Sequence, residues 1–127
     1  MSRLVKHYWE LDVYQAAFRL QQLIFRQSKR WPAEERFALT DQIRRSSRSI
    51  GANLAEAWAK RRYPAHFLSK LTDADGELQE THHWLATAQD CDYLQAAEHT
   101  EATAELEAVA RMLGSMIARH EAFCLTD

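Results

Sequence analysis

The chain has 127 residues, of which 46% are hydrophobic and 27% are charged, and its formal net charge is −2. This length predicts a single domain spanning residues 1–127. Three Gly and two Pro provide too few turn residues for a β-sandwich or barrel, so the composition favours long helices. Neither an apolar run of ~18 residues nor a signal-peptide pattern is present, which predicts a cytoplasmic protein without a membrane partner.

Apolar periodicity predicts four helices, over about residues 12–29, 33–62, 64–89 and 94–122. Pro32 and Pro64 interrupt the pattern, since a proline cannot continue a helix and disfavours helical angles in the residue before it. Residues 90–93 form the third break. Because short connections make sequential helices antiparallel neighbours, the expected fold is all-α, an antiparallel up-down-up-down four-helix bundle.

Each of the last three predicted helices has apolar or small residues at alternating steps of three and four, which keeps them on one side of a helix. We expect these positions to form the core: Ile43, Ser47, Ile50, Leu54, Ala57, Leu71, Ala74, Leu78, Thr81, Leu85, Ala88, Leu106, Val109, Leu113, Met116, His120 and Phe123.

The first predicted helix carries two apolar stripes rather than one. At ~100° per residue, one stripe comprises Val13, Ala16, Ala17, Leu20, Leu23 and Ile24. The other comprises Leu11, Tyr14, Phe18 and Phe25. A helix in an isolated bundle needs one such face, and a second one would leave a costly exposed patch. The second stripe therefore predicts a subunit interface, the alternative being that a tail or loop covers it.

Polar side chains follow one side of the second predicted helix, beside its core positions. This polar column comprises Gln42, Arg45, Ser49, Asn53, Glu56 and Lys60. Arg45 and Glu56 are roughly 16 Å apart along a helix and cannot pair with each other. If partly buried, each needs a partner on another helix or subunit, and Glu77 is a candidate for Arg45. The alternative is a solvated polar flank.

Charge is unevenly distributed along the chain. Residues 26–62 contain ten basic and four acidic residues, whereas residues 71–110 contain ten acidic residues and no Lys or Arg. One interpretation is self-complementarity, with basic helices lying against acidic helices or acidic neighbouring subunits. The other is a basic surface that binds RNA or DNA, although the acidic net charge argues against strong binding. The expected nucleic-acid contacts are Arg44, Arg48, Arg61 and Arg62.

Catalytic and metal-binding patterns are weak. Glu80-Thr81-His82-His83 provides one Glu-x-x-His motif, but a di-iron bundle needs two, with two further inward Glu residues. The serines at 46, 47 and 49 lack a nucleophile elbow, and the three glycines are isolated. We therefore expect no enzyme activity, catalytic residue, cofactor or metal, and a metal or small-ligand site is the disfavoured alternative.

Several motifs between Glu10 and about Ala88 resemble the 23S rRNA-intervening-sequence family. Leu39–Glu56 matches Leu-x-x-Gln-Ile/Leu-Arg-Arg-x-x-x-Ser-Ile-x-x-Asn-Ile/Leu-Ala-Glu. The start Glu10-Leu11-Asp12-Val13-Tyr14, the link Trp31-Pro32-Ala33-Glu34-Glu35-Arg36, and the later Phe67-Leu68-Ser69 and Glu77-Leu78 also match. The chain departs from the family at Ala57, usually Gly, and at Asp73-Ala74, commonly Gly-Ser.

The resemblance implies a four-helix bundle that forms homopentamers, and this agrees with the spare apolar stripe on the first helix. Some similar proteins are encoded within inserts in ribosomal RNA genes. A relative in diversity-generating retroelements partners a reverse transcriptase and is thought to bind nucleic acid through a basic surface. The resemblance therefore implies an assembly or interaction protein, partnered by itself, by nucleic acid or by a nucleic-acid-processing protein, with no catalytic residues.

Overall fold

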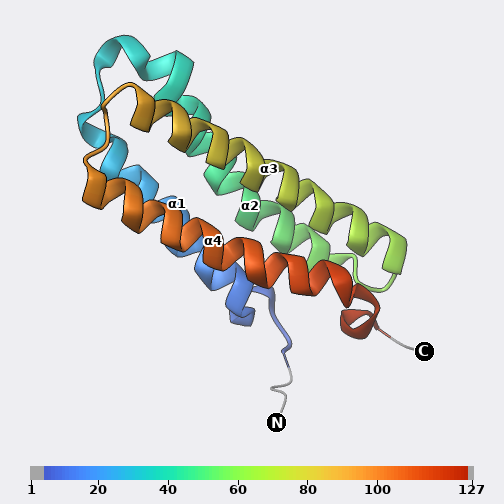
Figure 1. Ribbon diagram of the computed structural model, residues 1–127. Helices are drawn as coiled ribbons and strands as arrows, with labels where there is room; N and C mark the ends of the chain where they lie inside the picture. The colour runs from blue at the N-terminus through green and yellow to red at the C-terminus, as the bar shows by residue number, and fades with distance from the viewer. Residues whose placement is uncertain (1–4, 126–127) are drawn as a thin grey trace.

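The computed structural model describes residues 5–125, and this part of the chain is all-α. Its four long helices are α1 (Asp12–Gln27), α2 (Asp41–Ala59), α3 (Pro64–Asp90) and α4 (Ala96–Ala118). α2 packs against α1 and α3, and α4 packs against the same two helices, so each helix has two neighbours. In Figure 1 the α1–α2 and α3–α4 connections lie at the upper left and the α2–α3 connection at the lower right.

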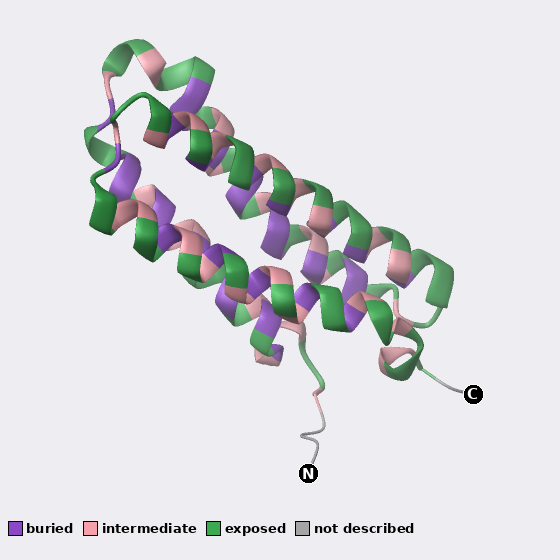
Figure 2. Ribbon diagram, viewed as in Figure 1, coloured by how far each residue is buried: buried purple, intermediate pink, exposed green. Residues whose placement is uncertain are grey.

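The four helices enclose one hydrophobic core, visible in Figure 2 as the buried turns on their inner sides. Every core position predicted for α2 and α3 is buried, and so is the first stripe of α1. In α4 the predicted positions are buried as far as Met116, whereas His120 and Phe123 are half-buried. The reason is that α4 ends at Ala118, and these two residues belong to a short 3₁₀ helix, His120–Phe123.

The predicted helix over 33–62 is wrong in its first third. The chain instead forms a 3₁₀ turn (Ala33–Glu35) and a π-helical turn (Arg36–Thr40) before α2 begins at Asp41. Glu35 has φ −95° and ψ 4°, outside helical angles, so an α-helical hydrogen-bond ladder cannot pass through it. At the other end of the predicted helix, Lys60 also leaves helical angles, and α2 ends at Ala59.

The other helix ends differ less from the prediction. α1 stops at Gln27 and continues as a 3₁₀ turn, Ser28–Arg30. α3 ends one residue later than expected, and Asp92 after it has φ 63° in the left-handed region, which Asp tolerates better than most residues. α4 begins at Ala96 rather than residue 94 because Gln95 is its N-cap, and the Gln95 backbone N–H donates to Glu98 Oε1 at 2.9 Å.

None of the helices within residues 5–125 is long and apolar enough to cross a membrane.

Candidate interaction surface between helices α1 and α2

The surface between α1 and α2 contains two adjoining depressions, which we call the α1–α2 groove. Both are lined by Arg48 and Ala52, so the groove is continuous along the two helices. Its floor and walls combine aromatic, small and basic side chains: Tyr8, Tyr14, Phe18, Gln21, Phe25, Asp41, Arg44, Arg45, Arg48, Ser49, Gly51, Ala52 and Ala55. The predicted interface aromatics and two of the predicted nucleic-acid contacts therefore lie in one place.

Three cations surround the ring of Phe25, and we call this arrangement the Phe25 cluster. The Arg44 guanidinium lies 4.8 Å from the ring centroid, the Lys29 ammonium 4.9 Å and the Arg48 guanidinium 5.5 Å. Arg44 Nε also donates to Ser28 Oγ at 2.9 Å. Cation–π attraction stabilises each contact, but the three like charges repel one another.

A row of aromatic rings lies at the other end of the groove. The ring centroids of Tyr8 and Tyr14 are 4.9 Å apart in an edge-to-face contact, and those of Tyr14 and Phe18 are 6.3 Å apart. Burial, with a smaller contribution from Tyr8, raises the pKa of Tyr14 above its ordinary value. Phe18 is 45% exposed, so the row of rings ends at an aromatic residue that is open to solvent.

Gly51 on α2 permits the close approach of Tyr14. A Cβ atom at Gly51 would lie 3.2 Å from Tyr14 Cε1, tighter than most van der Waals contacts. The absence of a side chain at this buried position therefore allows the Tyr14 ring to rest on the α2 backbone and form the groove wall.

The structure corrects the position of Leu11. It was predicted to share an exposed stripe with Tyr14, Phe18 and Phe25, yet it is 5% exposed and belongs to the core of the same chain. The physical reason is that Leu11 is the N-cap of α1, with extended angles of φ −67° and ψ 131°. Helical-wheel geometry does not apply to such a residue, and the surface stripe consists of the three aromatics alone.

The polar column on α2 reaches α3 through the ion pairs of Arg45 and Glu56, while Arg45 and Ser49 also line the α1–α2 groove. Arg45 Nη2 lies 2.8 Å from Glu80 Oε2, and Arg45 Nη1 lies 3.8 Å from the predicted partner Glu77. Glu80 Oε2 also accepts a hydrogen bond from Trp84 Nε1 at 3.1 Å. Because these groups are partly solvated, such pairs contribute little to stability, ~0–1 kcal/mol.

Four of the five remaining members of the polar column also have partners within the chain. Lys70 Nζ lies 2.6 Å from Glu56, and this hydrogen-bonded ion pair lowers the pKa of Glu56 and raises that of Lys70. Gln42, Ser49 and Asn53 each donate to a backbone carbonyl four or five residues earlier. The column therefore connects α2 to α3 within one chain.

The four predicted nucleic-acid contacts do not form one surface. Arg44 and Arg48 line the α1–α2 groove. Arg61 follows the end of α2, about 20 Å further along the axis. Its Nη1 donates to the Trp58 carbonyl at 2.7 Å, and its guanidinium lies 4.2 Å from the Trp58 ring. Arg62 is beside it in the same turn. Two pairs of arginines thus occupy different ends of α2.

No cluster of three or more His, Cys, Asp or Glu residues that could hold a metal ion occurs within residues 5–125. In the Glu80–His83 motif, Glu80 pairs with Arg45, while the His83 ring packs against Trp84 at 4.7 Å. Glu80 and His83 therefore contact side chains of α2 and α3.

Comparison with known proteins places this geometry in a family. The model of the family described as 23S rRNA-intervening sequence protein matches residues 9–115, which include all four long helices except the last three residues of α4. The chain belongs to this family. This match confirms that the Leu39–Glu56 motif resembles the family. The motif includes the groove residues Arg44, Arg48 and Gly51.

A solved structure supports the same assignment. It is a protein of unknown function of the S23 ribosomal protein family from Bacteroides thetaiotaomicron VPI-5482, with 28% sequence identity and a TM-score of 0.75. The alignment covers 84% of this chain and 95% of that one. No match is found among curated proteins.

Sequence reasoning missed four contributors to this intervening-sequence protein's surface. Tyr8 lies before α1, and its contact with Tyr14 depends on a 3₁₀ turn, Tyr8–Glu10, that periodicity does not reveal. Lys29 falls at the end of the first predicted helix, and its spacing of four from Phe25 could have indicated the cation–π contact between them. Ala52 and Ala55 gave no signal because small residues occur on exposed and buried helix faces alike.

Proposed function

We propose that this intervening-sequence protein is a non-enzymatic assembly protein of the cytoplasm that forms homopentamers through the α1–α2 groove. The observation that carries the proposal is the continuous groove in which Tyr14, Phe18 and Phe25 line a surface interrupted by small residues. Aromatic side chains are enriched at protein interfaces, and a contiguous apolar patch is costly to leave in water. Membership of the family supports the pentameric number.

The proposal includes an antiparallel up-down-up-down arrangement of the four helices. The alternation of the connections between the two ends of the molecule in Figure 1 supports it, as does the pairwise packing of α1 with α2 and of α3 with α4. In this arrangement the α1–α2 groove is bounded by two neighbouring helices of one chain and is present once in each copy.

The mass of the purified protein tests the assembly. Light scattering or native mass spectrometry at micromolar concentration should give about five times the chain mass of 14.8 kDa. Replacing Phe18 with Ser should reduce the assembled fraction, because it removes an exposed ring from the groove. Phe37 is 73% exposed and is not among the groove-lining residues, so Phe37→Ser is the matched control.

Two outcomes would contradict the proposal. A monomeric mass for the unaltered protein would exclude assembly at this concentration. Equal masses for the Phe18→Ser and Phe37→Ser variants, both still pentameric, would mean that the chain assembles through a surface other than the α1–α2 groove.

A second candidate function is binding of RNA or DNA, alone or with a nucleic-acid-processing protein. The Phe25 cluster favours it, because cations beside a half-buried ring can contact phosphates and stack on bases. A labelled single-stranded RNA or DNA should bind at ~50 mM salt and dissociate as salt rises. Arg48→Gln should weaken binding more than Lys60→Gln, and a lack of binding at low salt would remove this candidate.

A further inference from the structure

The Phe25 cluster is not neutralised within its own chain. None of its three cations lies within 4.0 Å of a carboxylate in residues 5–125, where the ion pairs involve other Lys and Arg residues. Asp41 lines the same depression without reaching ion-pair distance. Three positive charges at one ring therefore favour an incoming group that carries negative charge.

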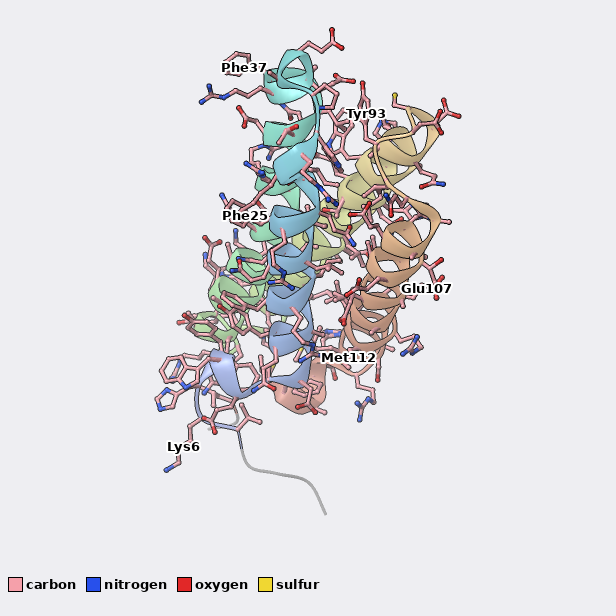
Figure 3. All side chains as sticks on the ribbon, turned by 90° about the vertical axis from the view of Figure 1, so that its left-hand side faces the viewer. Lys6, Phe25, Phe37, Tyr93, Glu107 and Met112 are labelled. Atoms are coloured by element: carbon pink, nitrogen blue, oxygen red, sulfur yellow. The ribbon has the colours of Figure 1, made fainter. Side chains whose placement is uncertain are left out.

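The first half of α4 carries four glutamates, of which Glu98 and Glu105 pair with arginines of the same chain and two do not. Glu101 and Glu107 are exposed, and neither has an ion-pair partner among the described residues. Glu101 borders α1, in a depression that Phe18 also lines, whereas Glu107 lies on the outer side of α4 (Figure 3). The residues around them are small, with Ala97 and Ala104 exposed on the same half of the helix. A helix face with carboxylates and alanines can approach another surface closely, which suits insertion into a groove.

Glu107 and the Phe25 cluster lie on different sides of the molecule (Figure 3). Figure 3 shows the labelled Phe25 on α1, with α2 on the left, and Glu107 on the far right of the view, on the outer side of α4. α2 and α4 are each packed against α1 and α3, so they occupy opposite positions around the core. One chain therefore cannot bring its own Glu107 to its own Phe25 cluster.

Symmetry decides which contact is favourable. If two copies paired groove to groove, the cations of one Phe25 cluster would face those of the other, and like charges in contact are costly. Contact between the groove of one copy and α4 of the next places carboxylates against cations. Such a contact joins two different surfaces, as every ring-shaped assembly requires.

We infer that the Phe25 cluster of one copy binds the outer face of α4, with Glu107, of the next copy. This inference rests on the proposed assembly function and names the partner of its groove. A second copy fits better than nucleic acid because each chain carries both the basic and the acidic surface, and its formal net charge is −2. The intermolecular contact places negative charge beside the three cations and covers Phe18 and Phe25 together.

Charge reversal at the two surfaces tests the inference. Arg48→Glu and Glu107→Arg alter exposed helix residues, and circular dichroism checks that both variants fold. Each single variant should weaken association by roughly 100-fold, since each places like charges in every contact. The double variant has opposite charges in every contact again and should recover the pentameric mass. Lys60→Glu and Glu34→Arg, exposed residues away from both surfaces, are the controls.

The outcomes separate this inference from the proposed function. If Phe18→Ser dissociates the assembly but the double charge variant does not recover it, the groove is the interface and α4 is not its partner. If Arg48→Glu abolishes RNA binding and leaves the mass unchanged, nucleic acid occupies the cluster and the inference is overturned. If the unaltered protein is a monomer, the proposed function fails first.

Discussion

The hydroxyl groups of Ser46 and Thr81 lie 2.9 Å apart in the buried contact between α2 and α3. Each hydroxyl also lies near a backbone carbonyl of its own helix, Thr81 Oγ1 at 2.9 Å from Glu77 and Ser46 Oγ at 3.3 Å from Ile43. Both side chains are 0% exposed. The pair lets two polar residues occupy the core without an unsatisfied hydrogen-bonding group.

Replacing Thr81 with Val should lower the free energy of unfolding by about 1 kcal/mol, because the buried hydrogen bond between the two hydroxyls is lost while the volume is nearly kept. Urea unfolding of Ser46→Ala, Thr81→Val and the double variant measures this. The double variant should lose less than the sum of the single losses, by ~0.5–1 kcal/mol. Strict additivity would mean that the two hydroxyls do not interact.

The three glycines should respond differently to replacement by Ala. A Cβ atom at Gly114 or Gly76 meets no atom within 4 Å, and both residues lie inside helices. Each replacement should therefore stabilise the protein by ~0.5–1 kcal/mol through helix propensity. Gly51→Ala should gain less, because its Cβ would press against Tyr14. Thermal unfolding of the three variants compares them, and an equal gain at Gly51 would show that the Tyr14 ring moves freely.

Tyr93 should titrate later than an ordinary tyrosine. Its hydroxyl donates to Glu35 Oε2 at 2.8 Å, and chiefly this hydrogen bond raises the pKa of Tyr93 to about 12. Glu35→Gln should return the pKa toward 10, the ordinary value, as measured by ultraviolet absorbance against pH. Tyr93→Phe identifies the signal, since it should remove the late-titrating component.

The same shift sets the direction of the pH dependence. A tyrosine whose pKa is higher in the folded state is favoured there in its neutral form. Its contribution to stability is fully present below pH 10 and is lost as the pH rises toward 12. Stability measured across this range should fall less steeply in Tyr93→Phe than in the unaltered protein, and equal slopes would contradict the assignment.

Phe67 and Phe123 offer a comparison of buried and half-buried rings. Phe67 is 0% exposed, and its ring centroid is 6.4 Å from that of Phe123 in the 3₁₀ helix after α4. Phe67→Ala should cost ~3–5 kcal/mol, because it leaves a cavity in the core. Phe123→Ala should cost clearly less, since the second ring is partly solvated. Denaturant unfolding distinguishes the two, and similar losses would mean that the short helix is integral to the core.

Local periodicity was enough to predict the inward face of every long helix. Positions such as Ile50 and Leu78 repeat at a spacing that depends on the helix alone, so they can be read without knowing the packing. Glu77 could be named as a candidate partner of Arg45 because the helices that carry them were expected to be neighbours. Glu80 and Lys70 required the relative height of α2 and α3, which residue spacing within one helix does not contain.

The surface was harder to predict because its members belong to different elements. Phe25 and Arg48 were recognised separately, one as an interface residue and one as a nucleic-acid contact, and their shared location depends on how α1 packs on α2. The prediction that Leu11 lies on the exposed stripe was wrong because an N-cap residue departs from helical angles. The positions of Arg61 and Arg62 could not be predicted from the helix pattern, because α2 ends before them.

The π-helical turn at Arg36–Thr40 has a consequence for length variation in relatives of this protein. A π turn accommodates one more residue than an α turn over the same rise, and it is followed here by a regular helix. Losing one residue from this stretch could be absorbed by tightening the turn, while Ile43 and Ile50 keep their inward orientation. Insertions and deletions between the first two helices should therefore accumulate at this point, and the helix after it should tolerate none.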